Sequence, residues 1–198
     1  MKTWTLDTAS ARAAHEIAAE YADTDLLNHS VRSFAFGARY AWQHGLAYDE
    51  ELLYVSALVH DLGLTPPFDS HTLPFEEAGG HVARVLTAGL GWPAARRARA
   101  EEIIVLHMRD DVSAAEDVES HLLQVGTSAD VSGLRVAEFD PVFTADLLAA
   151  YPRGDFGAAF LALVEDQAAR KPTCAAAAYV AGGAATRIAA NPLDRPRA

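Results

Sequence analysis

An apolar run that ends in two adjacent metal-ligating side chains is the feature that most restricts the fold of this chain. Residues 54–63 read Tyr-Val-Ser-Ala-Leu-Val-His-Asp-Leu-Gly, so His60 and Asp61 close a stretch suited to a buried helix. Burying a His–Asp pair is costly unless something binds it. Imidazole and carboxylate are both good ligands for divalent cations. We therefore predict that a core helix carries His60 and Asp61 to a metal site. The alternative is that the pair ends a helix and faces water.

The rest of the chain favours an all-α fold, a single-domain helical bundle. Apolar residues recur at helical spacing, as in Val31, Phe34 and Ala38, and no alternating strand pattern of any length is present. We predict one domain over residues 1–198, with a metal-site core at about 26–133 and C-terminal packing helices at about 141–190. The expected helices cover residues 8–21, 28–42 or 30–42, 49–61, 75–88, 94–108, 118–133, 142–151, 156–170 and 174–190.

Composition limits the partners of the protein. The net charge of -11 weighs against nucleic acid and anionic membrane, because both bind basic patches. The single cysteine, Cys174, leaves no disulfide framework and no cysteine-based zinc site. The first residues lack the long apolar run of a signal peptide, and no apolar stretch is long enough to span a bilayer. We expect a cytoplasmic, soluble protein that acts on a small molecule, and we leave open whether it forms a homo-oligomer.

Further candidate ligands lie in other expected helices. His29 stands near the start of the second helix, and Arg32 follows one turn later on the same face. His107 ends a second apolar run, residues 103–106. Asp130 follows a glycine in the 118–133 helix, where its poor helix propensity indicates that something else requires it there. The alternatives are a capping histidine at His29 and an ordinary surface ion pair at Arg32.

Two more features follow His60 and Asp61 along the chain. A proline-rich loop, residues 65–74, is placed to act as a lid or substrate wall, or equally as a passive connector. Glu76 comes early in the next helix, where its carboxylate could face the site. We expect Arg32, Phe68, Phe75 and Thr127 to contact the substrate.

Taken together, these positions resemble the HD-domain superfamily of metal-dependent hydrolases, whose pattern is a histidine, an adjacent His–Asp pair and a distant aspartate on a helical bundle. The resemblance is closer to its cyanamide hydratase branch. It rests on residues 27–37 (Leu-Asn-His-Ser-Val-Arg-Ser-Phe-Ala-Phe-Gly), residues 58–65 (Leu-Val-His-Asp-Leu-Gly-Leu-Thr), Phe75-Glu76, the run ending in His107, and residues 126–133 (Gly-Thr-Ser-Ala-Asp-Val-Ser-Gly).

The resemblance implies a ligand set and an activity. His29, His60, Asp61 and Asp130 become the ligands of one divalent metal, with zinc preferred and iron or manganese as alternatives. Glu76 and His107 become groups beside the metal that handle the substrate. The implied reaction is the hydration of a small nitrile such as cyanamide, which gives urea. The chain departs from the family pattern at Met108, where a threonine is common, and at His81, where no histidine is required.

The chemistry of the residues suits water addition. A metal held by imidazole and carboxylate lowers the pKa of a water molecule from 15.7 to about 7. We predict attack on a nitrile carbon, with the metal or His107 polarising the nitrogen and Glu76 or Asp61 managing the proton. The first alternative is a phosphohydrolase acting on a nucleotide or small phosphate ester. The second is a non-catalytic helical protein whose metal is structural or absent.

Overall fold

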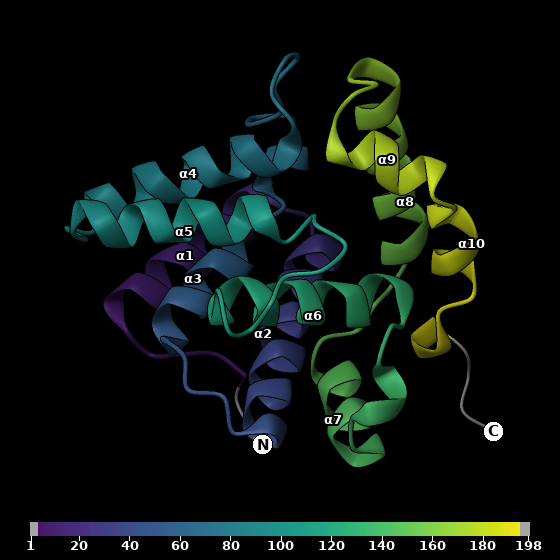
Figure 1. Cartoon of the computed structure of the whole chain (residues 1–198), viewed down its shortest axis with the longest axis horizontal. Coiled ribbons are helices and arrows are strands. Elements are labelled where there is room, and N and C mark those ends of the chain that lie inside the picture. The colour runs from purple at the N-terminus through teal and green to yellow at the C-terminus, as the bar shows by residue number, and fades with distance from the viewer. Residues whose placement is uncertain (1–3, 195–198) are drawn as a thin grey trace.

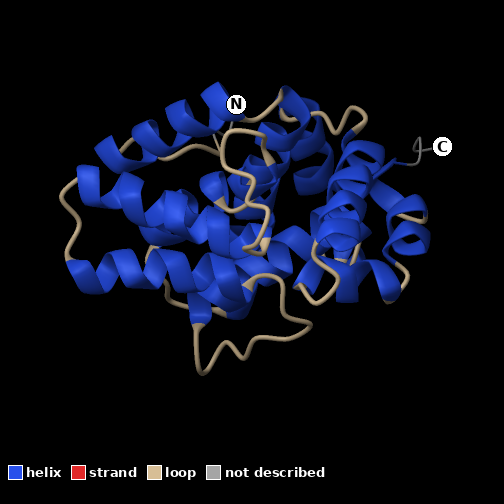
Figure 2. Cartoon of the chain, turned by 90° about the horizontal axis from the view of Figure 1, so that it is seen from above, coloured by secondary structure: helices blue, strands red, loops and turns tan. Residues whose placement is uncertain are grey.

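The computed structural model describes residues 4–194, and in that range the protein consists of helices and loops without strands (Figure 1, Figure 2). The α-helices are α1 (Ala9–Tyr21), α2 (Thr24–His44), α3 (Glu50–Val59), α4 (Phe75–Gly89), α5 (Ala94–Leu106), α6 (Val118–Ser132), α7 (Pro141–Ala150), α8 (Phe156–Arg170), α9 (Ala175–Ala181) and α10 (Ala184–Ala189). The 3₁₀-helices are η1 (Leu62–Leu64), η2 (Val136–Glu138) and η3 (Pro192–Asp194). The prediction of an all-α single-domain fold is confirmed.

Helix α3 is buried on every side. All residues from Leu52 to Val59 are buried in the main apolar core. A helix that is apolar all round has no solvent-facing side and must run through the interior. Asp49 caps its start by accepting a hydrogen bond from the Leu52 amide. The helix therefore carries His60, which directly follows its last residue, into the middle of the protein.

Helices α2 and α6 cross in direct contact at the centre of the molecule (Figure 1). Two glycines allow this approach. A Cβ added at Gly126 on α6 would lie 2.0 Å from the carbonyl oxygen of Ser33, and one added at Gly37 on α2 would lie 2.5 Å from that of Leu122. Real Cβ atoms do not come this close to another atom. The backbones of α2 and α6 therefore pack on each other with no side chain between them at these points.

The observed helices differ from the expected ones at two places. Helix α2 begins at Thr24 rather than at Asn28 or Ser30, because Asp23 accepts a hydrogen bond from the Leu26 amide at 2.8 Å and caps the helix there. The expected helix over residues 174–190 is two helices, α9 and α10. Gly183 between them has a φ of 88°, a conformation that ends a helix and that glycine adopts without strain.

The tail formed by α8, α9 and α10 packs beside the α2–α6 pair (Figure 1). Its apolar side chains include Phe156, Phe160 and Ile188, and they share one core cluster with Leu26 of α2 and Phe75 of α4. The tail therefore shares a core with the helices that carry the predicted metal ligands. Among the described helices, none combines the length and the hydropathy needed to cross a membrane.

We predict that Gly126→Ala lowers the free energy of unfolding by about 1–3 kcal/mol or more, because the added methyl group must push α2 and α6 apart. Gly89→Ala is the matched control. Gly89 also lies in a helix, but no atom lies within 4 Å of an added Cβ, so alanine there stabilises the protein by about 0.4–1 kcal/mol. Urea unfolding followed by circular dichroism compares the two variants. Equal unfolding midpoints would contradict direct backbone packing.

A second prediction concerns Asp117, which caps α6 and accepts hydrogen bonds from the Ser120 amide and from Arg99. Burial alone raises the pKa of Asp117, but the donors of Arg99 and Ser120 outweigh burial and lower it. A carboxyl group with a lowered folded-state pKa stabilises the protein above its ordinary pKa, and this contribution is lost as the pH falls through the folded-state pKa.

We therefore expect Asp117→Asn to cost on the order of 1 kcal/mol at neutral pH. The difference from wild type should shrink as the pH falls below about 4, where Asp117 of the unfolded chain becomes protonated, and it should be lost once the folded carboxyl group is protonated as well. Urea titrations at neutral and acidic pH measure the difference. A difference that grows on acidification would contradict the assigned sign.

Candidate metal centre

His29, His60 and Asp61 meet in the interior. Each side chain is at most 2% exposed, and their ligand atoms all lie within 4.8 Å of one another. Asp61 Oδ2 lies 3.4 Å from Nε2 of His29 and 3.2 Å from Nε2 of His60. His29 comes from α2 and the adjacent pair from the end of α3. The predicted meeting of these three residues, far apart in the sequence, is therefore observed.

His60 and His107 are placed by the same local device. Each occupies the C-terminal cap of its helix, α3 or α5, directly after an apolar run. The Nδ1 atom of His60 lies 2.7 Å from the carbonyl oxygen of Ala57, and that of His107 contacts the carbonyl oxygen of Ile104. Because a carbonyl oxygen only accepts, Nδ1 must carry the proton in both rings. In the neutral form of each ring, Nε2 is then the nitrogen with a lone pair, and it lies on the side of Asp61.

His29 reaches the cluster through the contact between α2 and α6. Along the crossing, Gly37 faces Leu122 and Ser33 faces Gly126. One further turn along both helices, His29 faces Asp130, because residues four apart share a helix face. The Nδ1 of His29 lies 2.7 Å from Oδ2 of Asp130. The third imidazole therefore also presents its Nε2 toward Asp61.

The carboxylate of Asp61 is the unsatisfied group of the cluster. Within residues 4–194, neither of its buried oxygens has a hydrogen-bond partner. Burial alone raises the pKa of Asp61, but His60 and His29 outweigh burial and lower it, so the group is ionised. A buried, ionised carboxylate without hydrogen bonds requires an explanation such as a bound ion. Two imidazole nitrogens beside it complete a donor set that fits a divalent cation.

His29 and His107 differ in their proton affinity. Burial alone lowers the pKa of His29, but the hydrogen bond to Asp130 and the nearby carboxylate of Asp61 outweigh burial and raise it. A cation bound to Nε2 of His29 therefore competes with a proton for this ring. Burial, followed by the nearby His60, lowers the pKa of His107 to about 4. His107 is thus neutral at physiological pH, with its Nε2 lying 3.9 Å from Oδ1 of Asp61.

Asp130 is held differently from the expectation that it ligates the metal. Its carboxylate accepts from His29, twice from Arg32 (2.7 and 2.8 Å), and from Arg153 at 2.8 Å. Asp130 is not part of the group of ligand atoms around Asp61. Burial raises the pKa of Asp130, but the charge of Arg32 outweighs it and lowers the pKa. The structure thus shows an ionised aspartate that contacts the predicted ligand His29 on the ring nitrogen facing away from Asp61.

The prediction that Arg32 contacts the substrate is corrected by its surroundings. Arg32 is 0% exposed, and its guanidinium donates to Asp130 and to the carbonyl oxygens of Tyr151 and Pro152. Every nitrogen of the guanidinium is occupied by these contacts. Arg32 therefore holds Asp130 and the chain before α8, and it has no path to a substrate.

A cavity of about 850 Å³ opens onto the cluster. Its inner wall carries His29, His60, Asp61 and His107. The predicted substrate contact Thr127 also lines it, from α6. Its far wall comes from the tail, and the lining residues there include Phe160, Tyr179 and Arg187. Sequence reasoning assigned the tail to packing and missed these residues, because Ala-rich helices carry no charge pattern that points to a site.

The remaining predicted contacts lie away from this cavity. Phe75 is fully buried, and its ring packs in a T-shaped arrangement against the ring of His107, with the centroids 5.9 Å apart. Phe68 packs on Tyr21, with the ring centroids 4.8 Å apart, and its contact with a substrate stays a prediction. Glu76 is buried, its Oε2 has no hydrogen-bond partner among the described residues, and burial raises its pKa. None of these three side chains is part of the cavity lining.

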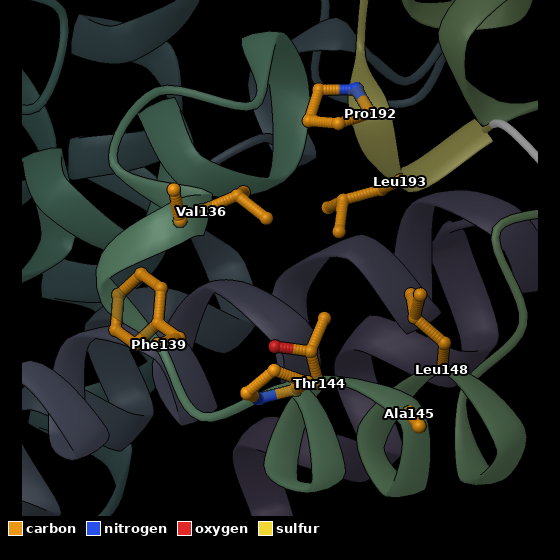
Figure 3. Close-up of a pocket in the computed structure, with 9 residues that line it drawn as sticks. Val136, Phe139, Thr144, Ala145, Leu148, Pro192 and Leu193 are labelled. Atoms are coloured by element: carbon orange, nitrogen blue, oxygen red, sulfur yellow. The ribbon is translucent and has the colours of Figure 1, made fainter. Parts of the chain in front are cut away.

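A second cavity, of about 640 Å³, lies between η2, α7 and η3. Figure 3 shows Val136, Phe139, Thr144, Leu148 and Leu193 around it. Apolar side chains dominate its lining, and no acidic, basic or histidine side chain is part of it. This second cavity therefore offers no group for acid–base or metal chemistry.

Comparison with known proteins agrees with the geometry. The family model described as HD domain matches residues 26–137, which is more than half of the chain. No curated protein matches the chain at the significance required. The matched range includes His29, His60, Asp61, His107 and Asp130, and it ends before the tail that closes the cavity.

We predict that His60→Ala and Asp61→Ala each remove the capacity to retain a divalent metal. The loss should exceed the roughly 10- to 100-fold drop in affinity typical of changes to groups that only hydrogen-bond to metal ligands. His81→Ala is the control, since His81 lies on α4 with a side chain that is 57% exposed. Elemental analysis of protein incubated with zinc and desalted measures the outcome. Full metal content in either variant would remove His60 or Asp61 from the ligand set.

Proposed function

Because this chain belongs to the HD-domain family of metal-dependent hydrolases, we propose that it adds water to a small nitrile-type substrate. The reaction takes place at a divalent cation held by His29, His60 and Asp61. The single observation that carries this proposal is the character of the cavity's inner wall. It presents imidazoles and one carboxylate, and the nearby arginines Arg32 and Arg153 are both committed to Asp130.

An uncharged electrophile suits such a wall better than a phosphoryl group. Phosphoryl transfer develops negative charge that arginine, lysine or several metal ions must stabilise. Among the described residues of the inner wall, no arginine or lysine is available for that purpose. A nitrile carbon carries no formal charge and needs one Lewis acid and one base. The side chains of the inner wall can supply both, because they can hold one cation and include the imidazole of His107.

Each residue then has a definite task. A bound divalent cation supplies a Lewis acid that polarises the nitrile and activates water. His107 holds its proton on Nδ1, so its Nε2 can accept a proton from the attacking water and then return that proton to the nitrogen of the resulting imidate. We therefore assign His107 the role of general base, which revises the expectation that it polarises the substrate. Asp61, with its lowered pKa, serves as a ligand and not as an acid.

The size of the cavity restricts the substrate further. Cavities of about 300–1,000 Å³ accommodate drug-sized ligands, and this one measures about 850 Å³. Cyanamide itself would fill a small part of it. Met108, Val131 and Phe160 give the lining an apolar component. We propose a nitrile that carries an organic substituent, with the nitrile group toward Asp61 and the substituent toward the tail.

Hydrolysis of a small phosphate ester is the second candidate, and a specific observation favours it. Arg109, Arg135 and Arg187 line the same cavity. Arg109 and Arg187 form no ion pair with an acidic side chain within the described part of the chain. Arginine is well suited to bind phosphate. These arginines line the same cavity as His29, His60, Asp61 and His107, so they could bind the phosphate group of such a substrate there.

A substrate panel separates the two reactions. Metal-loaded protein should convert organic nitriles to amides, or cyanamide to urea, and release no phosphate from nucleoside monophosphates. His107→Ala should lower kcat for the nitrile by about 10²–10⁴-fold, the usual contribution of a general base, whereas His81→Ala should leave it unchanged. Product formation followed by chromatography and a phosphate assay gives both readouts. Phosphate release without amide or urea formation would overturn the nitrile assignment in favour of the second candidate.

A further inference from the structure

Arg153 connects the metal centre to a part of the chain that lies outside the family match. It stands in the short segment between α7 and α8 and is 6% exposed. Its Nη1 atom donates to the backbone oxygen of Asp130 at 2.6 Å and to Oδ1 of the same residue at 2.8 Å. Its Nε atom donates to Asp194 in η3 at 2.5 Å. One buried guanidinium thus joins α6 to the end of the tail.

The carboxylate of Asp130 has no acceptor capacity left. An ionised carboxylate offers about four lone-pair sites. Arg32 fills one on each oxygen, Arg153 fills the second on Oδ1, and His29 fills the second on Oδ2. All four sites are occupied by protein donors. A cation could be bound by Asp130 only after one of these bonds was broken.

The same segment also fixes the ring of His29 from its face. Phe156, the first residue of α8, stacks on His29 with the centroids 4.3 Å apart and the planes inclined by 14°. Asp130 fixes the ring edge through Nδ1. With its face and its Nδ1 edge held, the imidazole turns its other nitrogen, Nε2, toward Asp61, and the hydroxyl of Ser33 lies 3.5 Å from this nitrogen.

We propose that Arg153 is a positioning residue of the metal centre. It locks Asp130 as the hydrogen-bond acceptor that holds His29 in its ligating tautomer, so Asp130 supports a metal ligand and is not a ligand itself. This inference rests on the metal centre of the proposed function but not on the identity of the substrate. It also assigns the segment before α8 a part in metal binding that the matched range 26–137 does not contain.

The hydrogen bonds to Asp130 explain why Arg153 is needed in addition to Arg32. With both arginines present, the rotation of the Asp130 side chain is blocked on both of its oxygens. Without Arg153, Oδ1 keeps one donor and the backbone oxygen of Asp130 keeps only the side-chain amide of Asn191. Asp130 then gains freedom to turn away from Nδ1, and His29 loses the partner that selects its tautomer.

The test measures zinc affinity by competition with a chromogenic chelator, and the visible absorption of the cobalt-substituted protein. Arg153→Ala should weaken zinc binding by about 10- to 100-fold, the usual effect of removing a group that orients a metal ligand. The cobalt band positions should stay those of the wild type, because no ligand is lost. Arg153→Lys, which restores the charge and one donor, should recover part of the affinity. If Arg153→Ala does not fold, Arg153→Lys alone should still show weakened binding.

Asp130→Asn and Arg99→Ala complete the comparison. Asp130→Asn should lower affinity without moving the cobalt bands, whereas loss of a true ligand would change them. Arg99 forms an equally dense network with Asp117, Glu102 and Glu119, which shares no partner with His29. Arg99→Ala should therefore lower thermal stability and leave zinc affinity unchanged.

The outcomes separate this inference from the proposed function. Wild-type protein that binds neither zinc nor cobalt would overturn both. Normal binding by the wild type together with unchanged affinity in Arg153→Ala and Arg153→Lys would overturn the positioning role alone. Cobalt bands that shift in Asp130→Asn would show that Asp130 is a ligand after all. Normal metal binding without nitrile hydration would overturn only the proposed reaction.

Discussion

The direct packing of α2 on α6 is the constraint on which the rest of the structure depends. Gly37 and Gly126 remove the side chains that would separate the two backbones. Because the two backbones are so close, His29 and Asp130, which lie one turn farther along the same helix faces, also meet. Nδ1 of His29 lies 2.7 Å from Oδ2 of Asp130. A spacing set by bulkier residues would leave the imidazole and the carboxylate out of hydrogen-bonding distance. The apolar contact thus determines the polar one.

The interior holds several charged groups, and among the described residues most of them are bonded to protein partners, with the carboxylates of Asp61 and Glu76 as exceptions. Arg32 and Arg153 saturate Asp130, and Asp194 balances Arg153. Burying such groups is tolerated only when hydrogen bonds and opposite charges replace water. At Asp61 this replacement stops, because both oxygens lack a protein donor. Asp61 is therefore a buried negative charge without a hydrogen-bond donor, and it lies where the Nε2 atoms of His29, His60 and His107 converge.

Much of this centre could be predicted from the sequence, since the predictive features are local. An apolar run ending in His60 and Asp61 has few structural solutions, and its repetition at His107 strengthens the inference. The all-α fold follows from periodicity. The role of Arg32 could not be predicted in this way, because a charged residue one turn from a histidine is equally suited to water, substrate or a buried carboxylate. Only the position of Asp130 on another helix decides among them.

Arg153 and the tail show the limit of local patterns most clearly. Arg153 lies between a proline and a glycine in a short connection, a context that predicts a turn and nothing about a partner on α6. Arg153 can contact Asp130 only once the tail has packed against the end of α2 and α6. The proposed metal ligands thus come from residues 26–137, whereas Arg153 and part of the cavity wall come from the stretch that follows. A fragment that ends at residue 137 would lack the tail residues that form one wall of the cavity beside Asp61.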